Sequence, residues 1–164
     1  RQLTDRFPYM DLDRVGIAAH LGGAGAVEGL LYHRELFKVG VTTWMQDSRL
    51  MSSSMWGEKL EGLEGPSANH HYPEELAHRL EGKLLIMGGM LDRCTPPAII
   101  LRFVEALCKE QKEFDLLLMP NFGHDVDTYT IKRTWDYFTR HLLGTEPPSN
   151  FRLSTPFDSI SMVD

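Results

Sequence analysis

The sequence predicts an α/β fold in which helices pack on a mostly parallel sheet. Short apolar runs typical of buried strands alternate with amphipathic segments along the chain. Glycine-rich polar turns follow several of these runs, and the composition, with 42% apolar and 24% charged residues, is that of a globular protein. At 164 residues the chain is one domain or part of a larger one. We expect at least four parallel strands flanked by helices.

The first unit along the chain is strand, helix, strand. The apolar run 15–19 predicts a buried strand that ends in a tight turn. Apolar residues recur at helical spacing in 24–33, and the β-rich run 37–42 predicts the second strand. The following 40 residues are irregular, apart from an expected short helix at 55–60 and a helix that Pro73 opens.

The second unit begins with the apolar run 83–88, which predicts the third strand. Pro96 and Pro97 then mark a helix start, because proline is favoured in a first helical turn. We expect the buried face of that helix to contain Ile100, Phe103, Val104, Leu107 and Cys108.

Residues 114–119 predict the fourth strand, which Pro120 ends. The last helix carries apolar residues at spacings of 4, 3 and 4 before Gly144 stops it; they are Ile131, Trp135, Phe138 and Leu142. We expect Trp56, Trp135 and Phe138 to be core residues. The domain then covers 1–146, and 147–164 form an extended tail.

Charge and composition exclude several classes of function. The formal charge of −6 argues against nucleic acid or an anionic membrane as the main partner. No stretch reaches the roughly 18 apolar residues of a membrane span, so we expect a soluble protein. Cys94 and Cys108 are expected to be reduced thiols. The first residue is Arg1 rather than Met, and no signal-peptide pattern follows it. We therefore expect the sequence to begin inside a longer polypeptide or after processing.

The residues that follow the strands are the candidates for chemistry, since functional groups gather at the carboxyl ends of strands in open α/β sheets. Asp92 follows the third strand and His124 the fourth. An acid and then a histidine in these places is the order in which an α/β-hydrolase supplies its Ser, Asp, His triad. The nucleophile is then expected after the first strand, where the sequence has Leu21.

Several segments, in the right order, resemble the catalytic domain of the prolyl oligopeptidase family in its dipeptidyl-peptidase-like branch. The resemblance covers about residues 7 to 146, and its segments are 11–17, 20–23, 56–59, 80–85, 114–120, 123–124 and 133–144. It implies that the chain is the C-terminal half of an α/β-hydrolase fold. In that family a propeller domain precedes the catalytic domain, and this sequence does not contain one.

Carried over to this sequence, the resemblance makes Asp92 the triad aspartate and His124 the triad histidine. The family pattern glycine, histidine, serine, any residue, glycine, glycine matches 19–24, which places Leu21 at the serine. The backbone N–H of Gly22 matches one oxyanion donor. Two substrate-binding positions also depart from the family: Gly25 replaces a tyrosine that often follows the turn, and Cys94 replaces an asparagine that helps to bind a peptide.

The resemblance implies a serine peptidase that cleaves short peptides and needs no cofactor. Leu21 has no hydroxyl, so we expect the chain to be inactive or strongly impaired, a pseudoenzyme. One alternative is a hydrolase that uses the Asp92 and His124 pair as general base without a covalent nucleophile. Another is a binding or assembly module. In each case we expect a homodimer or N-terminal polypeptide outside this sequence to complete the sheet.

Two other groups of residues are weighed and set aside. The candidate metal ligands near the helix that Pro73 opens are His70, His71, Glu74, Glu75 and His78. Because Pro73 begins the helix, His70 and His71 lie before it and not on its regular face. We therefore expect no metal site. Ser52, Ser53 and Ser54 are expected to be a polar loop rather than substitute nucleophiles.

Overall fold

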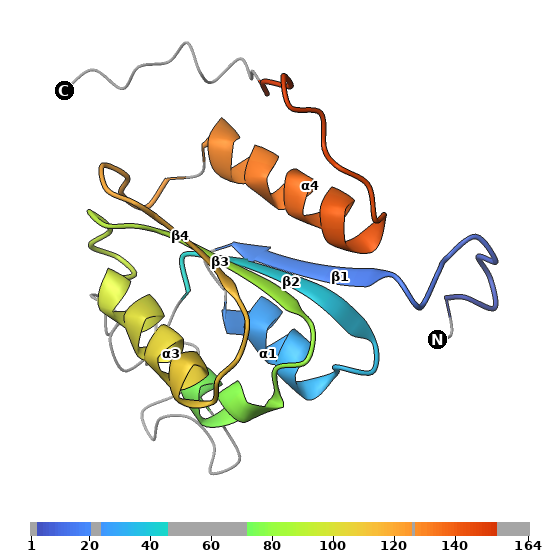
Figure 1. Ribbon diagram of the computed structural model, residues 1–164, viewed down its shortest axis with the longest axis horizontal. Coiled ribbons are helices and arrows are strands. Elements are labelled where there is room, and N and C mark those ends of the chain that lie inside the picture. Colours follow the sequence, from blue (N-terminus) through green and yellow to red (C-terminus); the bar gives the residue numbers. More distant parts are fainter. Residues whose placement is uncertain (1–2, 21–23, 46–71, 126, 154–164) are drawn as a thin grey trace.

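The computed structural model describes residues 3–20, 24–45, 72–125 and 127–153. They contain one sheet of four parallel strands in the order β1-β2-β3-β4 (Figure 1). The strands are β1 (Val15–His20), β2 (Phe37–Thr43), β3 (Lys83–Gly89) and β4 (Asp115–Met119). Each lies within one residue of the apolar run that predicts it, so the predicted parallel α/β fold is confirmed.

Helices cover both faces of the sheet (Figure 1). On one face lie α1 (Ala24–Tyr32), α3 (Pro97–Lys109) and the short helix η1 (Pro73–Arg79), and α4 (Thr128–Leu142) covers the other. The helix that Pro73 opens is a 3₁₀-helix, with the tighter turn that is common in short helical connectors. The short helix expected at 55–60 lies outside the described residues.

The two faces of the sheet have cores of different size. The larger core joins β2 and β3 to α1, η1 and α3; its fully buried residues include Leu30, Leu31, Leu84, Ile86, Phe103 and Leu107. The smaller core lies under α4 and consists of Val39, Val41, Leu85, Met87 and Tyr137. Burial of this apolar area stabilises the sheet by roughly 25 cal/mol per Å². The central strands β2 and β3 are therefore fixed from both sides.

Strand β1 is at one edge of this sheet and is only partly covered. It pairs with β2, and Ala18 in its middle is exposed. Trp135 on α4 is 51% exposed, so the prediction that it is a core residue is wrong. Its ring lies beside the edge strand, where it borders a hollow of about 340 Å³ together with Ala18 and Ile131. Phe138 is partly buried against the smaller core, and Trp56 lies outside the described residues.

The helix α3 also differs in one position from its predicted face. Ile100, Phe103 and Leu107 are buried as expected, and Val104 is partly buried. Cys108 is exposed, because it follows Leu107 by one position and so turns about 100° away from the core. Within the described residues, neither Cys94 nor Cys108 forms a disulfide bond.

Candidate active site

The carboxylate of Asp92 is fixed in the turn between β3 and α3. Its Oδ1 accepts the backbone N–H groups of Cys94 at 2.7 Å and Thr95 at 2.8 Å. Its Oδ2 accepts the Thr95 hydroxyl at 2.5 Å. Only 5% of Asp92 is exposed. An aspartate that binds backbone groups two and three residues ahead closes a tight turn, and here the turn leads directly into α3.

Burial and hydrogen bonding act in opposite directions on the pKa of Asp92. Burial raises it, because removal from water disfavours the charged form. Hydrogen bonds from the Thr95 hydroxyl, from His124 and from the two backbone N–H groups lower it, and the net effect is a pKa below the usual value. Asp92 is therefore ionised at neutral pH.

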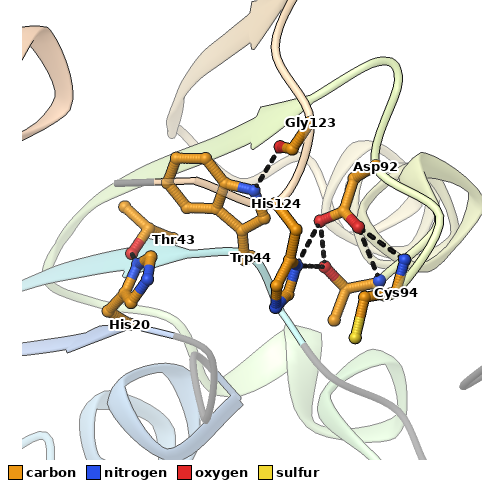
Figure 2. Close-up of polar contacts among 8 residues, drawn as sticks. His20, Thr43, Trp44, Asp92, Cys94, Gly123 and His124 are labelled. Carbon is orange, nitrogen blue, oxygen red and sulfur yellow. Dashed lines mark hydrogen bonds and ion pairs between the residues drawn. The ribbon is translucent and has the colours of Figure 1, made fainter. Parts of the chain in front are cut away.

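His124 lies in the turn after β4 and points at this carboxylate (Figure 2). Its Nδ1 is 2.8 Å from Oδ2 of Asp92. An ionised carboxylate can only accept a hydrogen bond, so Nδ1 carries a proton, and in the neutral imidazole Nε2 then has the lone pair. The His124 side chain is 28% exposed. The imidazole is thus oriented by the carboxylate and partly open to solvent, and both are features of a general base.

A second imidazole, that of His20, lies at the carboxyl end of β1. Thr43 donates its hydroxyl to the Ala19 carbonyl at 3.2 Å, so it accepts the Nδ1–H of His20 at 2.8 Å. Burial lowers the pKa of His20, and the charge of His124 lowers it further. Trp44 lies between the two histidines in Figure 2. The centroids of the Trp44 and His20 rings are 5.0 Å apart, and the rings meet edge to face.

The structure brings together only some of the residues that the sequence singles out. Asp92 and His124 are in contact, and Cys94 is half-buried in the turn that binds the carboxylate. Gly25 lies in the first turn of α1, where an added Cβ would have no atom within 4 Å. Leu21 and Gly22 lie outside the described residues, so their predicted roles stay predictions.

Thr95 and Trp44 escape the sequence-based reasoning, and His20 enters it only as part of the family pattern. Thr95 has a local signal, because an aspartate in a turn commonly bonds to groups a few residues ahead, as Asp92 does to Thr95. Trp44 and His20 follow or end strands at the sheet edge where functional groups gather. Their contacts join residues far apart in the chain, however, and no local spacing predicts them.

The residues weighed as metal ligands have other partners. Glu74 pairs with Arg102 of α3 at 2.8 Å, and His78 Nδ1 is 3.1 Å from the carbonyl of Glu75. His70 and His71 lie outside the described residues. Within the described ranges no group of three or more histidine, cysteine, aspartate or glutamate side chains is arranged to bind a metal. In the same ranges no helix combines the length and apolarity needed to cross a bilayer.

Comparisons with solved structures place this arrangement among peptidases. A Bacteroides ovatus protein assigned as a dipeptidyl aminopeptidase IV is similar over 86% of this chain and 21% of its own, with 27% identity and a TM-score of 0.74. Porphyromonas gingivalis dipeptidyl peptidase 4 is similar over the same shares of the two chains, with 23% identity and a TM-score of 0.75.

An acylaminoacyl peptidase from Pyrococcus horikoshii is similar over 91% of this chain and 27% of its own, with 22% identity and a TM-score of 0.71. The chain thus spans 21% to 27% of the length of these three structures. The comparison with curated proteins gave no match. The model of the prolyl oligopeptidase family matches residues 1–145. The strands, the Asp92 and His124 contact and this match together show that the chain belongs to the prolyl oligopeptidase family of peptidases.

Proposed function

We propose that this chain is a prolyl oligopeptidase family peptidase domain that keeps its acid–base pair but has lost its nucleophile, and is therefore inactive or strongly impaired. The observation that carries the proposal is the contact of Asp92 with His124 at 2.8 Å, in a chain that has Leu21 at the position of the serine. The aspartate and the histidine of the triad are thus in contact, and the residue at the serine position has no nucleophilic atom.

The chemistry of acyl transfer supports this proposal. A serine oxygen attacks the substrate carbonyl while the histidine takes the hydroxyl proton, and a leucine side chain has neither atom. A site without one triad member keeps a rate of roughly 10³ to 10⁴ over water, from the oxyanion hole and binding alone. Hydrolysis by this chain is therefore expected to be far below that of a serine peptidase.

In either of two alignments of residues 18–24, the family's serine falls on a residue without a hydroxyl or thiol. Counted back from the glycine pair Gly22 and Gly23, the serine of the family pattern falls on His20 rather than Leu21. Residues 18–23 are Ala, Ala, His, Leu, Gly and Gly, so neither alignment supplies a hydroxyl or a thiol. A test by substitution should therefore include both positions.

The substrates of this site, if a nucleophile is restored, are proposed to be short peptides with a free or acylated N-terminus. The relatives are named as dipeptidyl peptidases and an acylaminoacyl peptidase, which supports that class. Cys94 replaces an asparagine that binds peptide in the family, and its backbone N–H is already bonded to Asp92. We expect weaker binding of a peptide backbone for this reason.

A second candidate function is general base catalysis without a covalent intermediate. It is favoured by the free Nε2 of His124, whose side chain is 28% exposed while its Asp92 partner is buried. Such an imidazole is able to take a proton from water or from a substrate. This function predicts a slow turnover in the unchanged chain that His124→Ala abolishes.

A binding or assembly role is the third candidate. Its support is the partly covered edge strand β1 and the exposed Trp135 beside it, because an uncovered sheet edge favours pairing with further polypeptide. A second copy or a preceding part of a longer chain would serve. Sedimentation of the unchanged chain tests the first of these, since only self-association gives a dimer.

The experiment that tests the main proposal compares hydrolysis of dipeptidyl and acyl-ester chromogenic substrates by four chains. They are the unchanged chain, Leu21→Ser, His20→Ser, and the more active serine variant combined with His124→Ala. We expect one serine variant to gain about 10³-fold or more over the unchanged chain, and His124→Ala to remove that gain. Turnover by the unchanged chain at the level of the serine variants would overturn the proposal.

A further inference from the structure

Trp44 is held in an unusual place and conformation at the end of β2. Its backbone φ is 53°, in the left-handed region that bulky residues rarely adopt, yet only 1% of the residue is exposed. Its backbone N–H donates to the Met87 carbonyl at 3.1 Å. An unfavourable backbone conformation persists where the surroundings fix it, and such positions cluster at functional sites.

The indole of Trp44 reaches the turn that carries His124. Its Nε1–H donates to the carbonyl of Gly123 at 2.7 Å, a contact between residues 79 positions apart (Figure 2). That carbonyl belongs to the peptide group between Gly123 and His124. Glycine is the residue with the most backbone freedom, so a bond to this peptide group fixes the direction in which the His124 side chain leaves the chain.

The same turn is held from a second side by the end of β3. The carbonyl of Phe122 accepts the backbone N–H of Leu91 at 3.0 Å. A Cβ added to Gly89 would lie 2.3 Å from the backbone oxygen of Phe122 and 2.4 Å from that of Gly123. The His124 turn therefore packs directly against the backbone of β3. Of these three contacts, the one from Trp44 is the only one made by a side chain.

We propose that Trp44 is the positioning residue for His124: its indole N–H, bound to the Gly123 carbonyl, sets the peptide group from which the imidazole reaches Asp92. The inference rests on the proposed function in one respect, since it takes His124 as the retained acid–base group. Indole nitrogen is a donor only, so the bond to a carbonyl has one possible direction. Phenylalanine at this position keeps an aromatic ring in the core and removes the donor.

The test is the ¹H and ¹⁵N NMR signal of the His124 ring in Trp44→Phe. In the unchanged chain the Nδ1–H proton should appear far downfield because it is bonded to a carboxylate. In Trp44→Phe we expect this signal to move upfield and broaden. The matched control is Tyr137→Phe, which removes another buried side-chain donor, the hydroxyl bonded to Asp115 at 2.9 Å, away from the His124 turn. The control should leave the His124 signal unchanged.

An unchanged His124 signal in folded Trp44→Phe would overturn the proposal, as would an equal loss in Tyr137→Phe. If Trp44→Phe does not fold, hydrogen exchange in the unchanged chain decides. The indole N–H of Trp44 should then exchange as slowly as the core amides of β2, and fast exchange would contradict the inferred bond.

The role of Trp44 can also be tested by activity, in whichever serine variant hydrolyses substrate. Adding Trp44→Phe should lower kcat about tenfold to a hundredfold with a smaller change in KM, because it misplaces the base rather than the substrate site. The NMR readings need no turnover. A failure of the serine variants would therefore overturn the proposed function and leave the role of Trp44 to be decided by NMR.

Discussion

The carboxyl ends of β1, β3 and β4 lie on the same side of the parallel sheet, but they differ in which residues of the family's triad pattern they carry. At β3 and β4, Asp92 and His124 form the hydrogen bond that an acid–base pair needs. At β1, the residues that match the family's serine in either alignment are His20 and Leu21. Asp92 and His124 are thus in contact, whereas neither His20 nor Leu21 has a side-chain oxygen.

Under the proposed loss of the nucleophile, the hydrogen bonds of Asp92 give a physical reason for the aspartate to be kept. Asp92 accepts hydrogen bonds from Thr95 and Cys94 that close the turn into α3, whether or not His124 does chemistry. Hydrogen bonds to a charged group contribute about 1.5–3 kcal/mol each. The aspartate therefore has a structural role that is independent of catalysis.

The largest stability effect in the assembled region is expected from Gly89→Ala. The new Cβ would lie 2.3 Å and 2.4 Å from two backbone oxygens of the His124 turn, and backbone cannot move aside as a side chain can. We expect a loss of about 3 kcal/mol in the free energy of unfolding, measured by urea denaturation.

The matched control for that substitution is Gly25→Ala, where an added Cβ meets no atom within 4 Å. It should leave stability unchanged or raise it by up to about 1 kcal/mol, because alanine restricts the unfolded chain. Equal stability of Gly89→Ala and the unchanged chain would show that the His124 turn is not packed against the backbone of β3.

Asp92→Asn is expected to have the next largest effect, a loss of about 2 kcal/mol at pH 7. The pKa of Asp92 is lower in the folded chain than in the unfolded chain, so the ionised carboxylate stabilises the fold above the unfolded value of about 4. That contribution is lost as the pH falls through the lowered folded pKa.

The stability difference between Asp92→Asn and the unchanged chain should accordingly be constant from about pH 5 to 7 and shrink below about pH 4, as measured by denaturation at each pH. Asp13→Asn, at an exposed aspartate outside this network, is the control and should track the unchanged chain. A difference that grows as the pH falls would mean that the fold stabilises the protonated form of Asp92 instead.

The smallest effect is expected from Trp135→Gln near the β1 edge. Half of this side chain is exposed, and substitutions at such positions change stability by about 0.5 kcal/mol or less. Thermal unfolding measures the change. A loss as large as that of a buried tryptophan would show that the ring is packed in solution, as its helical spacing predicts.

Much of the fold follows from the sequence because strands and turns leave local signals. The apolar runs and Pro120 predict the four strands to within one residue. Trp135 shows the limit of such patterns: helical spacing predicts one apolar face for α4, but how far the sheet extends beneath that face depends on which strand is at the edge. Spacing in the sequence does not contain that information.

The candidate site was predicted unevenly for a related reason. Asp92 and His124 are visible because both follow strands and match a family pattern. The contact of Trp44 with Gly123 is not, because it joins residues 79 positions apart through one side-chain donor. Long-range hydrogen bonds of this kind are found only once the fold is known.

The most direct test of the central claim is covalent labelling with a fluorophosphonate, followed by the mass of the intact chain. A serine oxygen in place attacks phosphorus and displaces fluoride while His124 takes the hydroxyl proton. We predict no adduct on the unchanged chain, one adduct per chain on Leu21→Ser or His20→Ser, and none when His124→Ala is added. An adduct on the unchanged chain that His124→Ala abolishes would contradict the claim that its nucleophile is missing.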